Sequence, residues 1–315
     1  MHRSRTAPRF VVLSLKLCLL GASAQAGADD HDRGFYVRFE AGLADAGTLE
    51  SLLTAVDHPT RCDVLLYPDP GLAPSSDAAC RDNTSRPVFD NSFDLGSRFA
   101  GGVSIGYDLG KLRLELEHLS RHQGGQTVPA RTASGNVVIA GKGNEWSPVD
   151  PPTERVSDFS SREFLVNAYW DFENDSSWTP FLGIGAGWAR TNLRYQVRLL
   201  RKTLAQGYQD VAPPLTLADR PAAAAGSLSL FDHEFRGDVF GYQILAGLDH
   251  ALGDRTSFTI KVRWARFAEL TGRGIATVIR SHAPVQADGT TPFGSDLEFD
   301  GIGNVGVSAG LRYHF

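Results

Sequence analysis

The last twelve residues, Asn304–Phe315, carry an apolar side chain at every second position. Because successive side chains of a strand point to opposite faces, this segment has one apolar face and one small or polar face. The pattern continues to the terminal Phe315 and recurs upstream. It is typical of a strand in a membrane-spanning barrel, with lipid outside and a polar lumen inside.

Residues 1–26 have the features of a secretory signal peptide. A basic start precedes the mostly apolar run Phe10–Leu20, and an A-x-A cleavage signal follows at Ala24–Ala26. Lys16 interrupts the apolar run, so a short cytosolic amphipathic start is the alternative. No other segment is long and apolar enough for a transmembrane helix. An exported chain of this kind is soluble or crosses the membrane as a closed barrel. We expect residues 27–315 to form a single outer-membrane β-barrel domain.

Charge and cysteine content bear on three questions: whether the chain binds nucleic acid, whether it has a disulfide, and whether it binds a metal. Without residues 1–26 the chain keeps 27 basic and 36 acidic residues, which disfavours nucleic acid as a partner. Only Cys62 and Cys80 then remain, and an even pair in an exported chain indicates one disulfide, with two free thiols as the alternative. The sequence has no C-x-x-C motif and no compact Cys/His cluster, so we predict neither a metal site nor a cofactor.

Eight segments share the alternation of the C-terminal segment, and each has about the length that a tilted strand needs to cross a bilayer. They are Arg33–Leu43, Leu95–Tyr107, Lys111–Leu119, Arg162–Phe172, Thr179–Thr191, Val239–Ala251, Thr256–Phe267 and Asn304–Phe315. The predicted fold is therefore all-β, an eight-stranded antiparallel up-and-down transmembrane barrel.

The connections between these segments alternate strictly between short and long. The short ones are Asp108–Gly110, Glu173–Ser177 and Gly253–Arg255, and the long ones span about 44–93, 120–161, 192–237 and 268–303. Outer-membrane barrels have short periplasmic turns and long extracellular loops, whereas a soluble sandwich or lipocalin-like barrel does not require this asymmetry. We expect some strands to extend beyond the bilayer, at Leu193–Leu200 and Gly274–Ser281, and ten strands result if one extension also crosses it.

Several of these segments resemble the small outer-membrane barrel superfamily, which includes OmpA-like transmembrane domains, opacity-type porins and rickettsial-type surface antigens. The resemblance rests on F-L-V-N-A-Y-W-D-F (Phe164–Phe172), T-P-F-L-G-I-G-A-G-W-A (Thr179–Ala189), R-L-E-L-E (Arg113–Glu117) and G-L-R-Y-H-F (Gly310–Phe315). It implies integral insertion in a Gram-negative outer membrane, among its lipids and lipopolysaccharide. It also implies delivery by the barrel-assembly machinery, for which Tyr313 and Phe315 occupy the place of the assembly signal.

The strand phases direct ten charged side chains into the lumen, five of each sign. They are Arg38, Glu40, Arg113, Glu115, Glu117, Asp171, Asp249, Lys261, Arg263 and Arg312. Eight strands enclose a space that side chains can fill, and buried charges must be paired or hydrated. We therefore expect a neutralised ionic plug, with glycines on the inner face making room for the long side chains. A narrow path for ions or solutes is the alternative.

We expect the long loops to carry the function, because functional residues concentrate on loops that a rigid scaffold supports. We expect a surface protein, a scaffold or adhesin whose loops bind an extracellular ligand, with a small porin as the second possibility. A lipid A-modifying enzyme is a third, because His118-Leu119-Ser120 has the H-x-S spacing of one deacylase family. Arg121 stands where a companion Asn is expected, and the sequence shows no matching acidic partner, so we predict no catalytic residues.

Overall fold

The structure is a computed structural model that describes residues 33–58, 84–133, 146–206, 225–279 and 290–315. The described part consists of strands and one 3₁₀ turn, Leu204–Gln206. The strands are β1 (Gly34–Asp45), β2 (Thr48–His58), β3 (Thr84–Asp94), β4 (Ser97–Asp108), β5 (Leu112–His122), β6 (Gln126–Pro129), β7 (Thr153–Asp171), β8 (Trp178–Leu200), β9 (Leu228–Ala251), β10 (Thr256–Phe267), β11 (Leu270–Ile279), β12 (Thr290–Asp300) and β13 (Gly303–His314).

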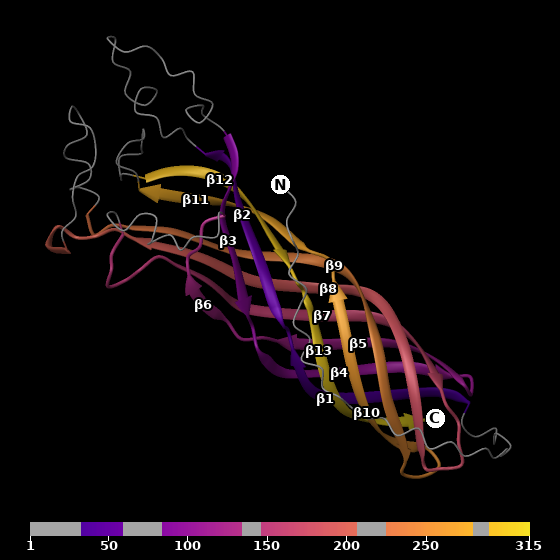
Figure 1. The fold of residues 1–315 in the computed structure, drawn as a ribbon. Coiled ribbons are helices and arrows are strands. Elements are labelled where there is room, and N and C mark those ends of the chain that lie inside the picture. Colours follow the sequence, from indigo (N-terminus) through magenta and orange to yellow (C-terminus); the bar gives the residue numbers. More distant parts are fainter. Residues whose placement is uncertain (1–32, 59–83, 134–145, 207–224, 280–289) are drawn as a thin grey trace, which may run out of the picture.

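Eight of these strands close into an antiparallel barrel. The order is β5-β4-β1-β13-β10-β9-β8-β7, and pairing of β5 with β7 completes the ring. The terminal strand β13 pairs with β1 from His314 opposite Tyr36 to Val305 opposite Asp45. Each barrel strand coincides with one of the eight segments expected from the alternation, so the predicted fold class is confirmed (Figure 1).

Beyond the barrel, the strands continue into a second structure that we call the crown. The crown comprises the sheet β11-β12-β2-β3, the short strand β6, and the parts of β7, β8 and β9 far from the short turns. It lies at the end of the barrel away from the C-terminus (Figure 1). The predicted extension of β8 to Leu200 is confirmed, as is the strand that contains Gly274.

Four barrel strands enter the crown sheet through two-residue breaks. One break holds Gly47 at φ 64°, a second holds Gly96 at φ 64°, and a third holds Gly301 at φ 81°. A side chain is rarely tolerated at such angles, so glycine permits the change of direction there. The ranges predicted as long loops therefore contain much regular structure: β7 begins at Thr153 rather than Arg162, and β9 at Leu228 rather than Val239. That part of the prediction was wrong because it required an apolar outer face, which the crown does not have.

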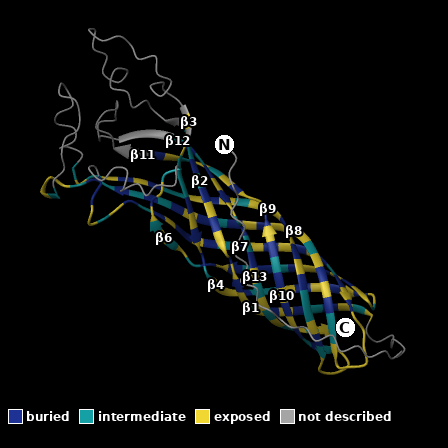
Figure 2. Cartoon of the chain, in the orientation of Figure 1, coloured by how far each residue is buried: buried dark blue, intermediate teal, exposed yellow. Residues whose placement is uncertain are grey.

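The polarity of the wall reverses between barrel and crown. Along the barrel strands, buried and exposed residues alternate (Figure 2). The exposed outward residues there are mostly apolar, whereas the buried inward ones are mostly polar or charged. The crown interior is apolar instead. Its buried members include Leu49, Leu53, Phe93, Val156, Phe159, Leu193, Tyr195, Val197, Phe231, Phe235, Leu297 and Phe299. The barrel therefore has the polarity required in lipid, and the crown has that of a water-exposed domain.

Two predicted features lie outside the described residues: the signal peptide at 1–26 and both cysteines, Cys62 and Cys80. Within the described ranges, no helix is long and apolar enough to cross a membrane. The same ranges hold no group of three or more His, Cys, Asp or Glu side chains arranged to bind a metal ion.

Candidate functional site

The structure places all ten predicted lumen residues inside the barrel. Nine are buried, and Arg312 is partly buried near the short turns. They form tiers along the barrel axis. Nearest the turns, Arg113 pairs with Asp171 at 2.6 Å and with Asp249 at 3.0 Å. Arg312 reaches Asp249 from the other side at 3.3 Å, so this tier holds two bases and two acids.

In the middle tier, Arg38 pairs with Glu115 at 2.5 Å. Two tyrosines join this pair, because the hydroxyls of Tyr36 and Tyr169 each donate a hydrogen bond to Glu115 at 3.1 Å. Arg38 also lies 3.6 Å from Glu40 of the next tier, which connects the two levels.

The upper tier is the most highly connected part of the lumen. Lys261 pairs with Glu40 at 2.6 Å and with Glu117 at 2.9 Å. Arg263 pairs with the same two carboxylates, at 3.2 Å from Glu40 and in direct contact with Glu117. The amide of Gln243 donates to Glu117 at 3.0 Å. Two bases and two acids therefore neutralise each other in a space that water reaches poorly, as buried charges require.

A further ion pair, absent from the predicted lumen residues, lies above these tiers. Arg121 pairs with Glu163 at 2.6 Å, and both side chains are fully buried. Arg263 links this pair to the upper tier at 3.8 Å. Arg121 also lies over the ring of Phe159 at 5.3 Å, so it joins the charged lumen to the apolar crown. Continuing the β5 alternation two residues past Leu119 would have found Arg121. The whole set, six bases and six acids, is called the lumen network below.

The inner-face glycines were expected to make room for charged side chains, but several adjoin polar uncharged ones. A Cβ on Gly106 would lie 2.2 Å from the Tyr36 ring, and one on Gly183 would lie 2.5 Å from the Tyr169 ring. The glycines therefore admit the tyrosines, whose hydroxyls complete the hydrogen bonding of Glu115.

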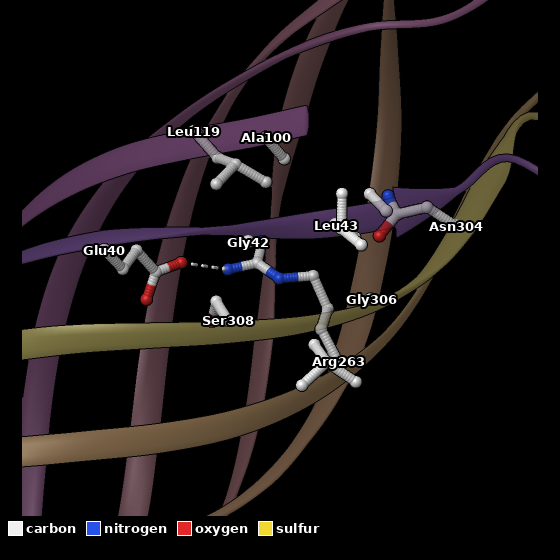
Figure 3. A pocket seen from close by; sticks show the side chains of 11 residues that line it. Glu40, Gly42, Leu43, Ala100, Leu119, Arg263, Asn304, Gly306 and Ser308 are labelled. Atoms are coloured by element: carbon white, nitrogen blue, oxygen red, sulfur yellow. Dashed lines mark hydrogen bonds and ion pairs between the residues drawn. The ribbon is translucent and has the colours of Figure 1, made fainter. Parts of the chain in front are cut away.

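A small cavity of about 20 Å³ lies between the lumen network and the crown, which is room for one water molecule. Figure 3 shows Glu40 and Arg263 on one side and Asn304 on the other. Neither polar atom of the buried Asn304 amide has a hydrogen-bond partner among the described residues. A cavity of this size holds water but is too small to be a solute pathway.

Inside the crown, one carboxylate on β7 accepts hydrogen bonds from three other segments. Glu154 of β7 is fully buried and accepts hydrogen bonds from the Tyr195 hydroxyl at 2.6 Å, the Arg131 backbone N–H at 2.9 Å and the Asn91 amide at 3.0 Å. Burial raises the pKa of Glu154, and the three hydrogen bonds oppose that rise.

This carboxylate should make crown stability depend on pH. Because the folded pKa of Glu154 is raised, the folded crown binds the proton more tightly than the unfolded chain. The resulting stabilisation is complete below the usual pKa of 4.5 and is lost as pH rises through the folded pKa. Exposed acids such as Glu234 and Asp238 have lowered pKa values, so their contributions are lost only at lower pH.

We expect crown amides to exchange hydrogen more slowly at pH 5 than at pH 7.5, after correction for the intrinsic rate. Glu154→Gln should abolish this difference. Equal pH dependence in both proteins would contradict this assignment of the effect to Glu154.

On the outer surface of the crown, ion pairs occupy the positions that apolar side chains occupy on the barrel. Examples are Arg194 with Asp232 at 2.6 Å across β8 and β9, and Arg273 with Asp296 at 2.9 Å across β11 and β12. Exposed pairs of this kind contribute little stability individually, but they mark a surface that meets water.

His118 and Ser120 of the H-x-S motif lie on the outward face of β5, away from the lumen. The His118 ring stacks on Phe164 with centroids 4.6 Å apart, and no described carboxylate bonds to it. At the other end of the barrel, Phe315 is 73 % exposed and its ring lies edge-on to Tyr313 at 5.7 Å. The predicted assembly-signal residues are therefore accessible on the lipid-facing side.

An apolar outer belt, a charged lumen, strict antiparallel closure and aromatic residues near both rims occur together in barrels that span a bilayer. The chain is an integral outer-membrane β-barrel. No protein-family model matches the sequence, and a search of curated proteins finds no match. Among solved structures, this barrel is similar to Neisserial surface protein A, with 13 % identity, TM-score 0.32 and coverage of 90 % of this chain and 97 % of the other.

Two other solved structures give comparable values. The outer membrane protease OmpT from Escherichia coli has 10 % identity and TM-score 0.38, with 93 % of this chain and 100 % of that chain covered. The outer membrane protein OprG from Pseudomonas aeruginosa has 12 % identity and TM-score 0.37, with 90 % and 98 % covered. Identities and scores this low carry no information about activity.

The exposed apolar side chains on the outer face of the barrel form the belt, and their position predicts where a charge is tolerated. Ile184 of β8 is 68 % exposed in the middle of the belt, and an arginine at the bilayer midplane costs about 2–4 kcal/mol. Ile184→Arg should lower the free energy of unfolding in liposomes by that amount, as measured by urea titration. Leu228→Arg is the matched control, because Leu228 is an exposed aliphatic residue of the crown. That change should stay within about 0.5 kcal/mol. Equal losses for the two variants would contradict the membrane placement of the belt.

Proposed function

We propose that this barrel is a closed surface scaffold whose crown, rather than its lumen, carries the function. The observation that carries the proposal is the charge balance of the lumen network, in which each of the twelve ionic side chains pairs with an opposite charge. A lumen whose charges neutralise each other leaves no free charges to attract and pass ions.

The crown supports the second half of the proposal. Its apolar core lies over the lumen network, and the Phe159 ring packs on Arg121 where the two meet. A core of this kind gives the extracellular strands a defined shape, which suits a surface that binds a partner. On this basis we assign the barrel a binding role at the cell surface, through the crown and the segments that connect its strands. The proposed role requires no catalytic residue.

The test compares the purified barrel with a crown-deleted form in which short turns replace β2–β3 and β11–β12. Both proteins are applied to an array of glycans and extracellular matrix proteins. We expect saturable binding of the complete protein to one class of probe and loss of that signal on deletion. Binding that survives the deletion, or no binding by the complete protein, would contradict the proposal.

A small porin is the second candidate, and the charged character of the lumen is the observation in its favour. It predicts unit conductance in a planar bilayer, which the closed scaffold does not.

A further inference from the structure

The outward face of the crown carries a ladder of arginines just above the belt, and those on β8 and β9 have acidic partners. Arg190 binds Asp238 through two bonds of 2.8 and 3.1 Å, and Arg236 binds Glu234 at 2.7 Å. The crown wall is therefore nearly neutral along these two strands.

Arg162 of β7 departs from this pattern. Its side chain is exposed, and it has no ion pair or hydrogen bond among the described residues. The register places it directly opposite Arg190 on β8, and opposite Ser120 on β5. Because Arg190 is already bound to Asp238, the charge of Arg162 is the one at this level that no described carboxylate neutralises, and Ser120 places a hydroxyl beside it.

The surface immediately below Arg162 is apolar and aromatic. The next outward residue on β7 is Phe164, which stacks on His118 at 4.6 Å. Beside it on β8 is Trp188, which is 59 % exposed and packs edge-on against Phe240 at 5.6 Å. A ligand that fits both levels has an anionic head at Arg162 and apolar chains along the belt.

We propose that Arg162, with Ser120 beside it on β5, binds the phosphate of a phosphorylated lipid in the outer leaflet. Guanidinium groups bind phosphate through paired hydrogen bonds, and the Ser120 hydroxyl supplies a further donor. Phe164 and Trp188 contact the acyl chains of the same lipid. This site is independent of the crown's proposed partner, because it faces the membrane boundary.

Arg155 provides a matched control on the same strand. It is also an exposed arginine without a described partner, but it lies opposite Gln196, beyond the bulge at Asp158, and away from the aromatic residues of the belt. General attraction of lipid to positive charge would involve both arginines, whereas the proposed site involves Arg162 alone.

The experiment measures binding of bisphosphorylated lipid A to the refolded protein in detergent by native mass spectrometry. We expect Arg162→Gln to weaken binding about tenfold and Arg155→Gln to leave it unchanged, with lipid A stripped of its phosphates bound as weakly as in the first variant. Arg162→Lys should recover part of the affinity, because it restores the charge without the paired hydrogen bonds. Slow migration of the unheated variants on a gel would verify folding.

Three results would overturn the proposal. They are wild-type affinity in Arg162→Gln, equal binding of the phosphate-free lipid, and equal loss in the two glutamine variants. Inorganic phosphate forms a separate arm and should not bind at concentrations that saturate the lipid. Phosphate binding at Arg162 with no preference for the lipid would overturn the assignment to a lipid.

Discussion

Glu117→Gln is expected to lower the free energy of unfolding of the barrel by about 3–5 kcal/mol, the usual effect of removing one partner from a buried ionic pair. The change leaves Lys261 with Glu40 alone, and Arg263 with Glu40 and the more distant Glu163, in a lumen where neither cation is exposed to bulk water. Urea titration in liposomes, followed by tryptophan fluorescence, measures the loss.

A paired variant separates lost charge balance from lost packing. Glu117→Gln combined with Lys261→Met removes one charge of each sign, so it should be less destabilised than the single variant. Glu234→Gln is the surface control, since its ion pair with Arg236 is exposed, and it should cost at most about 1 kcal/mol. A loss below 1 kcal/mol in the single variant would mean that the lumen network does not hold the barrel together.

Phe299→Ala is expected to destabilise the crown by about 3–5 kcal/mol, because it creates a cavity in a packed core. The Phe299 ring is fully buried and lies 5.7 Å from the rings of both Tyr195 and Phe235, so it joins β12 to β8 and β9. Hydrogen exchange of the protein in liposomes should show faster exchange in β2, β8 and β12.

The effect of Phe299→Ala should remain within the crown, since the lumen network and the wall hydrogen bonds of the barrel are unchanged. Ile275→Ala is the control, because Ile275 is 62 % exposed on β11 and should change exchange very little. Uniform acceleration across barrel and crown would show that the two unfold as one unit. Unchanged exchange would show that the apolar core does not hold the crown.

The barrel strands could be predicted because lipid requires an apolar outer face, and a single strand displays that requirement fully. The crown was harder to predict because the apolar residues change faces within one strand. Along β8, Leu182, Ile184 and Trp188 point outward, whereas Leu193 and Tyr195 point inward. Side chains continue to alternate beyond Trp188, but there the outward residues are polar and the apolar ones point inward, so a criterion based on an outward apolar face stops at Trp188.

The same limit explains half of the missing ion pair, because Arg121 lies two positions beyond the predicted strand end at Leu119, where the wall changes polarity. Glu163 could have been predicted, because it lies within Arg162–Phe172 and next to the outward Phe164. The ten predicted lumen residues lie deeper, where phase is unambiguous. Their partners still required the structure, because pairs such as Arg263 with Glu117 join residues that are 146 positions apart in the sequence.

Planar-bilayer recording of the refolded, full-length protein tests the closed-scaffold account most directly. The paired charges of the lumen network predict no reproducible unit conductance, either in the complete protein or after deletion of β2–β3 and β11–β12. Unit conductance in the complete protein that is altered by Glu117→Gln would contradict the account and identify the lumen as an open path.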